Sequence, residues 1–216
     1  MEKSERNRKT VMTGWTQDFD VSGAGRERYR SFLAYFDEKG NAIEEIHYNK
    51  KGIIIIKKQF NPDGKVLEET HFNEDGSLNY KYIYQYDHQG REREKATYGT
   101  SGRLHNRWIP EYDGTGRITR TVCYDKTGNL EVEDKYDYKQ TEQENIVTKE
   151  RGAVAAWTYT YDKKGNLLTV TGGYFSDDEG EKREFFYNDE GLLVQERELD
   201  YTSRIKRITV YEYGRV

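Results

Sequence analysis

The stretch Tyr112-Asp113-Gly114-Thr115-Gly116-Arg117-Ile118 returns twelve residues later as Tyr124-Asp125-Lys126-Thr127-Gly128-Asn129-Leu130. Both copies place an aromatic residue before Asp, two variable positions, Gly, one variable position and an aliphatic residue. Looser copies with Phe or Asn recur from Phe36 to Leu193, at intervals that are mostly 12 and occasionally 14 residues. This periodicity predicts a repeat protein whose core is distributed along its length.

Each copy has the residue types of a tight turn. In Asn61-Pro62-Asp63-Gly64 the order Asn, Pro and Gly suits a type I turn followed by a residue with positive φ. The leading Asp or Asn can accept from a backbone N–H two residues on, and Gly tolerates the left-handed conformation. We therefore interpret these carboxylates as turn caps and not as metal ligands. The turn residues with the clearest signature are Asp87, Gly90, Asp113, Gly116, Asp125, Gly128, Asp162 and Gly165.

The segments between the turns are about seven to nine residues long and rich in Tyr, Ile, Val and Thr, which is typical of strands. They leave no room for crossover helices, so the chain is predicted to be an all-β antiparallel meander of about fifteen short strands. Because large open sheets twist, we expect a coiled or rolled repeat sheet. Residues 1–27 are expected to form a tail and an irregular lead-in, and residues 28–216 the repeat array. Strands near Tyr29–Phe36 and Ile205–Tyr213 are expected to leave open edges for strand addition or continuation.

Aromatic residues two apart near alternate turns should share one face of the sheet, as in Tyr84-Gln85-Tyr86 and Tyr159-Thr160-Tyr161. The run Ile53–Ile56 breaks alternation and is expected to be covered on both faces. One register is the expected inner face, although charged residues in the same register imply that this face is wet or that turns shift the parity. That register contains Ile54, Ile56, Val66, Leu78, Tyr82, Leu104, Trp108, Ile118, Val122, Leu130 and Val132, together with Trp157.

The phrase Tyr-Asp-x-x-Gly-Arg/Asn-Leu, preceded by Tyr two positions earlier, resembles the tyrosine-aspartate (YD) repeat of the bacterial Rhs and wall-associated protein families. The match is best at 84–91, 112–118, 124–130 and 159–167. The resemblance implies β-hairpins that spiral into a strip or shell, in surface-exposed or toxin-delivering proteins, and hence an extracellular or cell-envelope location. A MORN-like repeat is the second resemblance.

Composition bounds the possible functions. Hydrophobic residues make up 34% of the 216 residues, charged residues another 34%, and 19 residues are Tyr, which predicts a thin fold without a thick apolar core. The net charge of −4 with interleaved signs argues against nucleic acid. Cys123 is the single cysteine and excludes an internal disulfide. No apolar run approaches the ~20 residues of a spanning helix, so no membrane span is expected. The polar start, 1–10, does not resemble a signal peptide.

No catalytic, cofactor or metal motif stands out. His47 and His71 should lie two strands apart, too far to share an ion. Carboxylate pairs such as Glu44-Glu45, Glu68-Glu69 and Glu131/Glu133 could frame a glycosidase site, but cross-strand Lys and Arg partners explain them more simply. The hypothesis is a non-enzymatic scaffold or binding module for a protein or surface glycan. A carbohydrate-active enzyme and a structural spacer or shell fragment are the alternatives. The candidate contact residues are Trp108, Trp157, Tyr84 and Tyr159, because amphipathic aromatic rings suit both kinds of ligand.

Overall fold

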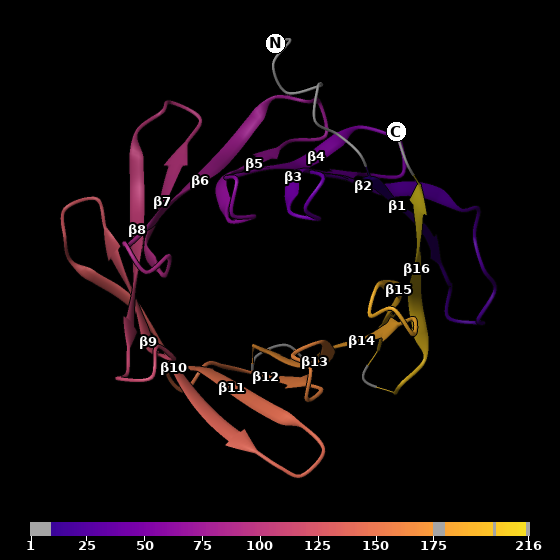
Figure 1. Ribbon diagram of the computed structural model, residues 1–216. Coiled ribbons are helices and arrows are strands. Elements are labelled where there is room, and N and C mark those ends of the chain that lie inside the picture. Colours follow the sequence, from indigo (N-terminus) through magenta and orange to yellow (C-terminus); the bar gives the residue numbers. More distant parts are fainter. Residues whose placement is uncertain (1–9, 175–179, 201, 215–216) are drawn as a thin grey trace.

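The strands form a closed antiparallel barrel (Figure 1). The computed structural model describes residues 10–174, 180–200 and 202–214. Sixteen strands are found there: β1 (Thr10–Asp18), β2 (Tyr29–Phe36), β3 (Ala42–Tyr48), β4 (Ile54–Phe60), β5 (Val66–Phe72), β6 (Leu78–Tyr86), β7 (Glu92–Gly99), β8 (Leu104–Tyr112), β9 (Ile118–Asp125), β10 (Leu130–Gln140), β11 (Asn145–Arg151), β12 (Ala155–Tyr161), β13 (Leu167–Tyr174), β14 (Glu181–Tyr187), β15 (Leu193–Leu199) and β16 (Ile205–Gly214). Every strand pairs with its sequence neighbours, which confirms the meander. The open twisted, coiled or rolled repeat sheet was the wrong prediction, because the first and last strands also pair.

β1 closes the barrel. It pairs with β16 from Val11↔Gly214 to Asp18↔Arg207, and on its other side it pairs with β2. Residues 10–18 were expected to be an irregular lead-in, since they lack the turn phrase, but they form a regular strand. The prediction of open edge strands is wrong for the same reason: backbone groups on both terminal strands are used in the seam.

The expected absence of a membrane span also needs correction. In the described residues, no helix is long and apolar enough to span a membrane. The prediction rested on helix length alone. Closed barrels satisfy every backbone group between strands and are the second arrangement that spans membranes, so the helix criterion excludes nothing for this topology.

The turn chemistry was predicted correctly. The Asp113 carboxylate Oδ1 accepts from the backbone N–H groups of Thr115 at 2.8 Å and Arg117 at 3.0 Å. Gly116 has φ of 85°, in the left-handed region that its missing Cβ permits. The same pair of bonds to the leading Asp recurs in the turns that begin at Asp87, Asp125 and Asp162. The motif therefore caps turns.

β-Bulges beside the turns explain why no single register marks the inner face. Trp108 pairs with Cys123 and Glu111 with Arg120, but Tyr112 pairs with Ile118, which leaves Thr119 as an extra residue. Similar shifts occur at most hairpins, and each resets the side-chain parity. The predicted inner register is therefore divided between two faces. Ile54, expected to be covered on both faces, is 37% exposed.

Tyrosines at alternate turns link each hairpin to the preceding one on the same barrel end. Each hydroxyl donates to the backbone carbonyl of the residue twenty positions earlier: Tyr86 to Val66 (2.7 Å), Tyr112 to Glu92 (2.8 Å), Tyr187 to Leu167 (3.0 Å) and Tyr213 to Leu193 (2.9 Å). Cations cover two rings of this set: Lys65 lies 5.5 Å from the Tyr86 centroid and Arg91 lies 4.9 Å from the Tyr112 centroid. The repeated Tyr thus ties neighbouring hairpins together.

We predict that Tyr112→Phe lowers the free energy of unfolding by about 1 kcal/mol, because one hydrogen bond to a backbone carbonyl is lost. The measurement is urea denaturation. Tyr98→Phe is the matched control: Tyr98 precedes a turn at the other end, and no described residue bonds its hydroxyl. Equal losses in both variants would contradict the proposed role of the hydroxyl.

The barrel wall is one sheet thick and wet on both faces. Its accessible surface is 13946 Å², against the roughly 10,000 Å² that scaling gives for a compact protein of this mass. Ion pairs cross the outer face, including Lys57–Glu44 at 2.8 Å and Lys81–Glu68 at 3.2 Å. Lipid-facing strands carry apolar side chains at such positions. The eight buried apolar residues of the described part are Phe32, Ala34, Ala96, Val122, Cys123, Ala155, Val170 and Leu199.

Candidate functional site

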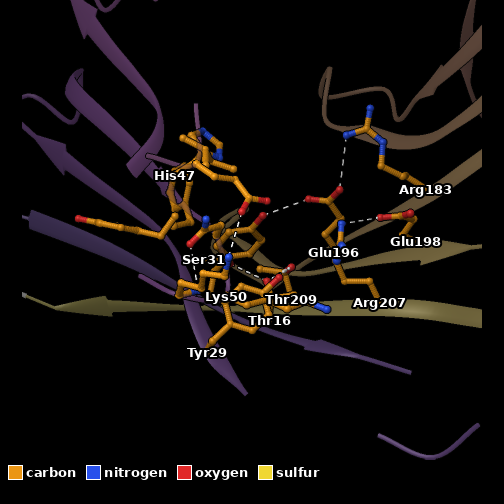
Figure 2. Close-up of a pocket in the computed structure, with 17 residues that line it drawn as sticks. Thr16, Tyr29, Ser31, His47, Lys50, Arg183, Glu196, Glu198, Arg207 and Thr209 are labelled. Atoms are coloured by element: carbon orange, nitrogen blue, oxygen red, sulfur yellow. Dashed lines mark hydrogen bonds and ion pairs between the residues drawn. The ribbon is translucent and has the colours of Figure 1, made fainter. Parts of the chain in front are cut away.

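A cavity of about 730 Å³ lies on the inner side of the barrel seam. Strands β1–β4 supply one wall and β14–β16 the other. Figure 2 shows His47 on the first wall facing Arg183 and Glu196 on the second. Lys50, from the turn that precedes β4, reaches inward to Asp18 at 2.5 Å. The cavity therefore depends on closure of the barrel.

Three hydroxyl groups form its floor. Thr16 Oγ1 shares hydrogen bonds with Ser31 Oγ at 2.6 Å and Thr209 Oγ1 at 2.7 Å. Thr16 and Thr209 stand opposite each other in the seam, so their side chains share a face. Thr16 is 1% exposed and Thr209 is 8% exposed. The hydroxyls satisfy one another and fix the floor.

Aromatic rings border this floor. Phe32 packs edge-on against His47, with centroids 5.0 Å apart, and against Tyr211 at 5.8 Å. Tyr29 also lines the cavity. The lining therefore combines ring surfaces with hydrogen-bonding groups, which is the usual make-up of small-molecule sites.

Charged groups in the cavity compensate one another. Arg207 donates to Asp18 at 2.8 Å and to Glu198 at 3.0 Å. Glu196 accepts from Tyr211 at 3.1 Å and lies 3.5 Å from Arg183. These pairs leave the carboxylates engaged.

Asp18, Tyr29 and Tyr211 near the cavity have shifted pKa values. Burial opposes ionisation of Asp18, but Lys50 and Arg207 outweigh it and hold the pKa of the carboxyl below its usual range. Burial raises the pKa of Tyr29, and burial with the Glu196 charge raises the pKa of Tyr211. Each of these three groups therefore keeps its ordinary charge state at neutral pH.

Two of the predicted contact residues meet on a different arc of the inner wall. Trp108 on β8 and Trp157 on β12 both contact Arg151, whose guanidinium carbon is 5.2 Å and 5.6 Å from the two ring centroids. Tyr84 lies in the same cross-strand row as Trp108, through Lys95. Tyr159 stands two residues from Trp157 on the same face. None of the four lines the seam cavity.

A buried carboxylate holds this tryptophan cluster. Asp134, 1% exposed, accepts from Arg151 Nε at 2.7 Å and Nη2 at 3.0 Å. Lys149 Nζ lies 3.0 Å from the same carboxylate. Arg151 also donates to the Tyr174 hydroxyl at 3.0 Å. The sequence analysis did not single out Asp134 or Arg151. The signal that could have identified them is a charged residue at an inward-facing position, on β10 and on β11.

The carboxylate pairs considered for glycoside hydrolysis are divided between the faces. Glu44 pairs with Lys57 on the outer face, and Glu45 lies 3.2 Å from Lys58 on the inner face. Adjacent residues of a strand point to opposite sides, so such a pair cannot flank one bond. The prediction of cross-strand cationic partners is confirmed for these residues. His71 lies 2.6 Å from Glu69.

The fold defines the class: a closed sixteen-stranded antiparallel β-barrel with a polar, aromatic inner face. No family model matches the sequence, and no curated protein matches it. Among solved structures, a porin-like protein from Bacteroides uniformis ATCC 8492 aligns over 97% of this chain and 98% of its own, with 8% identity and a TM-score of 0.45. A chain in the crystal structure of TcdB2-TccC3-Cdc42 aligns over 89% of this chain and 13% of its own, with 16% identity and a TM-score of 0.32.

These findings overturn the family resemblance. The repeat phrase resembled the YD repeat, which implied β-hairpins that spiral into a strip or shell, and, second, the MORN-like repeat. No family model supports either, and the sheet closes. The shared phrase reflects a common turn: Asp caps, Gly reverses the chain and the aromatic residue packs beside it. Turn chemistry of this kind arises in any meander of short strands.

Proposed function

We propose that the protein is a non-enzymatic binding barrel that holds a neutral, polar ligand of saccharide type in the seam cavity. The observation that carries the proposal is a cavity of about 730 Å³ lined by aromatic rings, hydroxyls and mutually paired charges. Small-ligand sites have volumes of about 300–1,000 Å³, whereas a folded protein partner needs about 800 Å² of matching surface. A small ligand therefore suits this concave site better.

The charge balance selects the ligand class. Asp18, Glu196 and Glu198 are engaged by Lys50, Arg183, Arg207 and Tyr211. A neutral ligand can hydrogen-bond to such pairs without breaking them, while a charged ligand would have to displace a partner. Tyr29 and Phe32 offer ring surface for the apolar face of a sugar.

We also propose that the protein is located in the cell envelope or outside the cell. Closed meanders of this strand number occur among the barrels of the bacterial outer membrane, and the ion pairs on the outer face of this barrel favour an aqueous part of the envelope over the lipid. Cell fractionation followed by immunoblotting tests it, and recovery of the protein in the cytosol alone would contradict it.

We expect the purified chain to bind a neutral oligosaccharide on a glycan array, and Tyr29→Ala to weaken that binding at least tenfold in calorimetry, since a ring in contact with the sugar contributes about 1.5 kcal/mol or more. Tyr98→Ala is the control, because Tyr98 pairs with the outer-face residue Lys81 and does not line the cavity. Hydrolysis of the bound glycan would refute the non-enzymatic role. Equal affinity in the Tyr29 and Tyr98 variants would refute the site.

A further inference from the structure

The inner wall around Trp108 carries a cluster of cations. Three cations, Lys95, Lys149 and Arg151, lie over the rings of Trp108 and Trp157. The buried carboxylate among them is Asp134, and Arg151 and Lys149 already share it. The strands that carry these groups, β7–β12, lie on the opposite arc of the barrel from the seam strand β1 (Figure 1).

Lys95 is the cation that this arrangement leaves uncompensated. Among the described residues, none forms a hydrogen bond or an ion pair with its ammonium group. Its contacts are ring faces: Nζ lies 4.9 Å from the Tyr82 centroid and 5.3 Å from the Trp108 centroid. Burial lowers the pKa of Lys95 and outweighs the opposing charge of Glu92, which is the response of an ammonium group removed from water without a directly bonded anion.

Nearby acids, Glu92 more than Glu69, stabilise the Lys95 charge only through space, and none of the described ones forms an ion pair with it. Glu69 is bonded to His71 at 2.6 Å and to the Tyr84 hydroxyl at 3.4 Å. Burial raises the pKa of Glu92 and the Lys95 charge opposes that rise, so the two groups attract each other without forming an ion pair. The Glu131 carboxylate accepts from the Cys123 thiol at 3.6 Å. A charge this far desolvated is stable beside a ligand that carries the opposite charge.

We propose that Lys95 and Lys149, held by the rings of Tyr82, Trp108 and Trp157, form a binding site for an oxyanion, separate from the seam cavity. The aromatic rings position the two ammonium groups and exclude water from one side of each. The oxyanion accepts charge-assisted hydrogen bonds from both. Asp134 accepts two hydrogen bonds from Arg151, which acts as a positioning residue behind the site, whereas Lys149 makes one contact with Asp134 and keeps further N–H groups for the oxyanion. The inference does not depend on the saccharide proposal, because it uses other strands and the opposite ligand charge.

The test is calorimetric titration of the full chain with sulfate, phosphate and an oligogalacturonate, each at constant ionic strength set with chloride. At least one of these should bind, and Lys95→Met should reduce its affinity at least tenfold, because Met keeps an apolar stem of similar length without the charge. Lys81→Met, which removes an outer-face cation paired with Glu68, should leave the affinity unchanged. Preference for the oligogalacturonate over the inorganic ions would identify a carboxylated polymer as the source of the anion.

A second measurement needs no variant. Acetic anhydride labels accessible lysines, and mass spectrometry reports each site. The bound anion should slow acetylation of Lys95 at least threefold and leave Lys81 unaffected. The proposal is overturned if none of the three anions binds. It is also overturned if the anion that binds neither slows acetylation of Lys95 nor loses affinity in the Lys95→Met variant. That result would leave the proposal of a neutral saccharide in the seam cavity unaffected.

Discussion

Asp134→Ala is expected to lower the free energy of unfolding by about 3–5 kcal/mol, which is enough to unfold many proteins of this size. The carboxylate is 1% exposed and bonded to both Arg151 and Lys149. Its removal leaves two cations on the inner wall without an anion, and the desolvation of each is no longer offset. Urea denaturation followed by tryptophan fluorescence would report the loss, because Trp108 and Trp157 both contact Arg151.

Glu111→Ala provides the matched control. Glu111 forms an ion pair with Arg120 at 2.9 Å, but its side chain is 51% exposed. Exposed pairs contribute about 0–1 kcal/mol, so the control should lose no more than that. Equal losses in the two variants would show that burial of the Asp134 pair is not what stabilises the wall.

The same cluster sets a pH dependence. Burial opposes ionisation of Asp134, but Arg151 and Lys149 outweigh it, so the pKa of Asp134 is lowered in the folded state. The stability that the pair contributes is therefore present above the unfolded pKa of about 3.9 and is lost as pH falls through the folded value. Wild-type protein should lose stability in that acid window, and Asp134→Ala should show a shallower slope there.

The turns could be predicted from sequence because their causes are local. Asp113, Gly116 and the residues between them contain all the groups that the turn needs, and they lie within four positions of one another. Strand number and direction follow from the turn spacing. The fifteen strands expected after residue 28 correspond to β2–β16.

Closure and the seam cavity could not be predicted, because their causes are distant in sequence. Arg207 and Asp18 are separated by 189 positions, and Thr16 and Thr209 by 193. The strand Thr10–Asp18 has no turn phrase on its N-terminal side, so the repeat did not mark it as a strand. Trp108 and Trp157 were chosen because amphipathic aromatic rings suit both protein and glycan ligands, and their role as contact residues stays a prediction. Their meeting around Arg151 depends on the curvature of the wall.

A seam disulfide should form readily in the double variant Thr13→Cys/Glu212→Cys and stabilise the protein by up to about 5 kcal/mol. The two residues are direct partners across β1 and β16, and they lie on the face opposite Gly14 and Tyr211. The bond would close a loop of nearly the whole chain, and the entropy that it removes from the unfolded state grows with loop length. Oxidation should give a faster-migrating monomer on a non-reducing gel and a higher unfolding midpoint.

The pair Thr13→Cys/Glu111→Cys distinguishes closure from chance contact. Glu111 lies on β8, on the far side of the ring from β1, so its cysteine cannot reach position 13 without unfolding. An open sheet would place β1 and β16 at opposite edges and give the two double variants the same low yield. A closed barrel gives an intramolecular bond in the seam pair alone. The walls of the candidate cavity come from both sides of the seam, so the disulfide-locked protein should retain the saccharide affinity of the wild type. Loss of that affinity would show that the closed barrel is not the state that binds the saccharide.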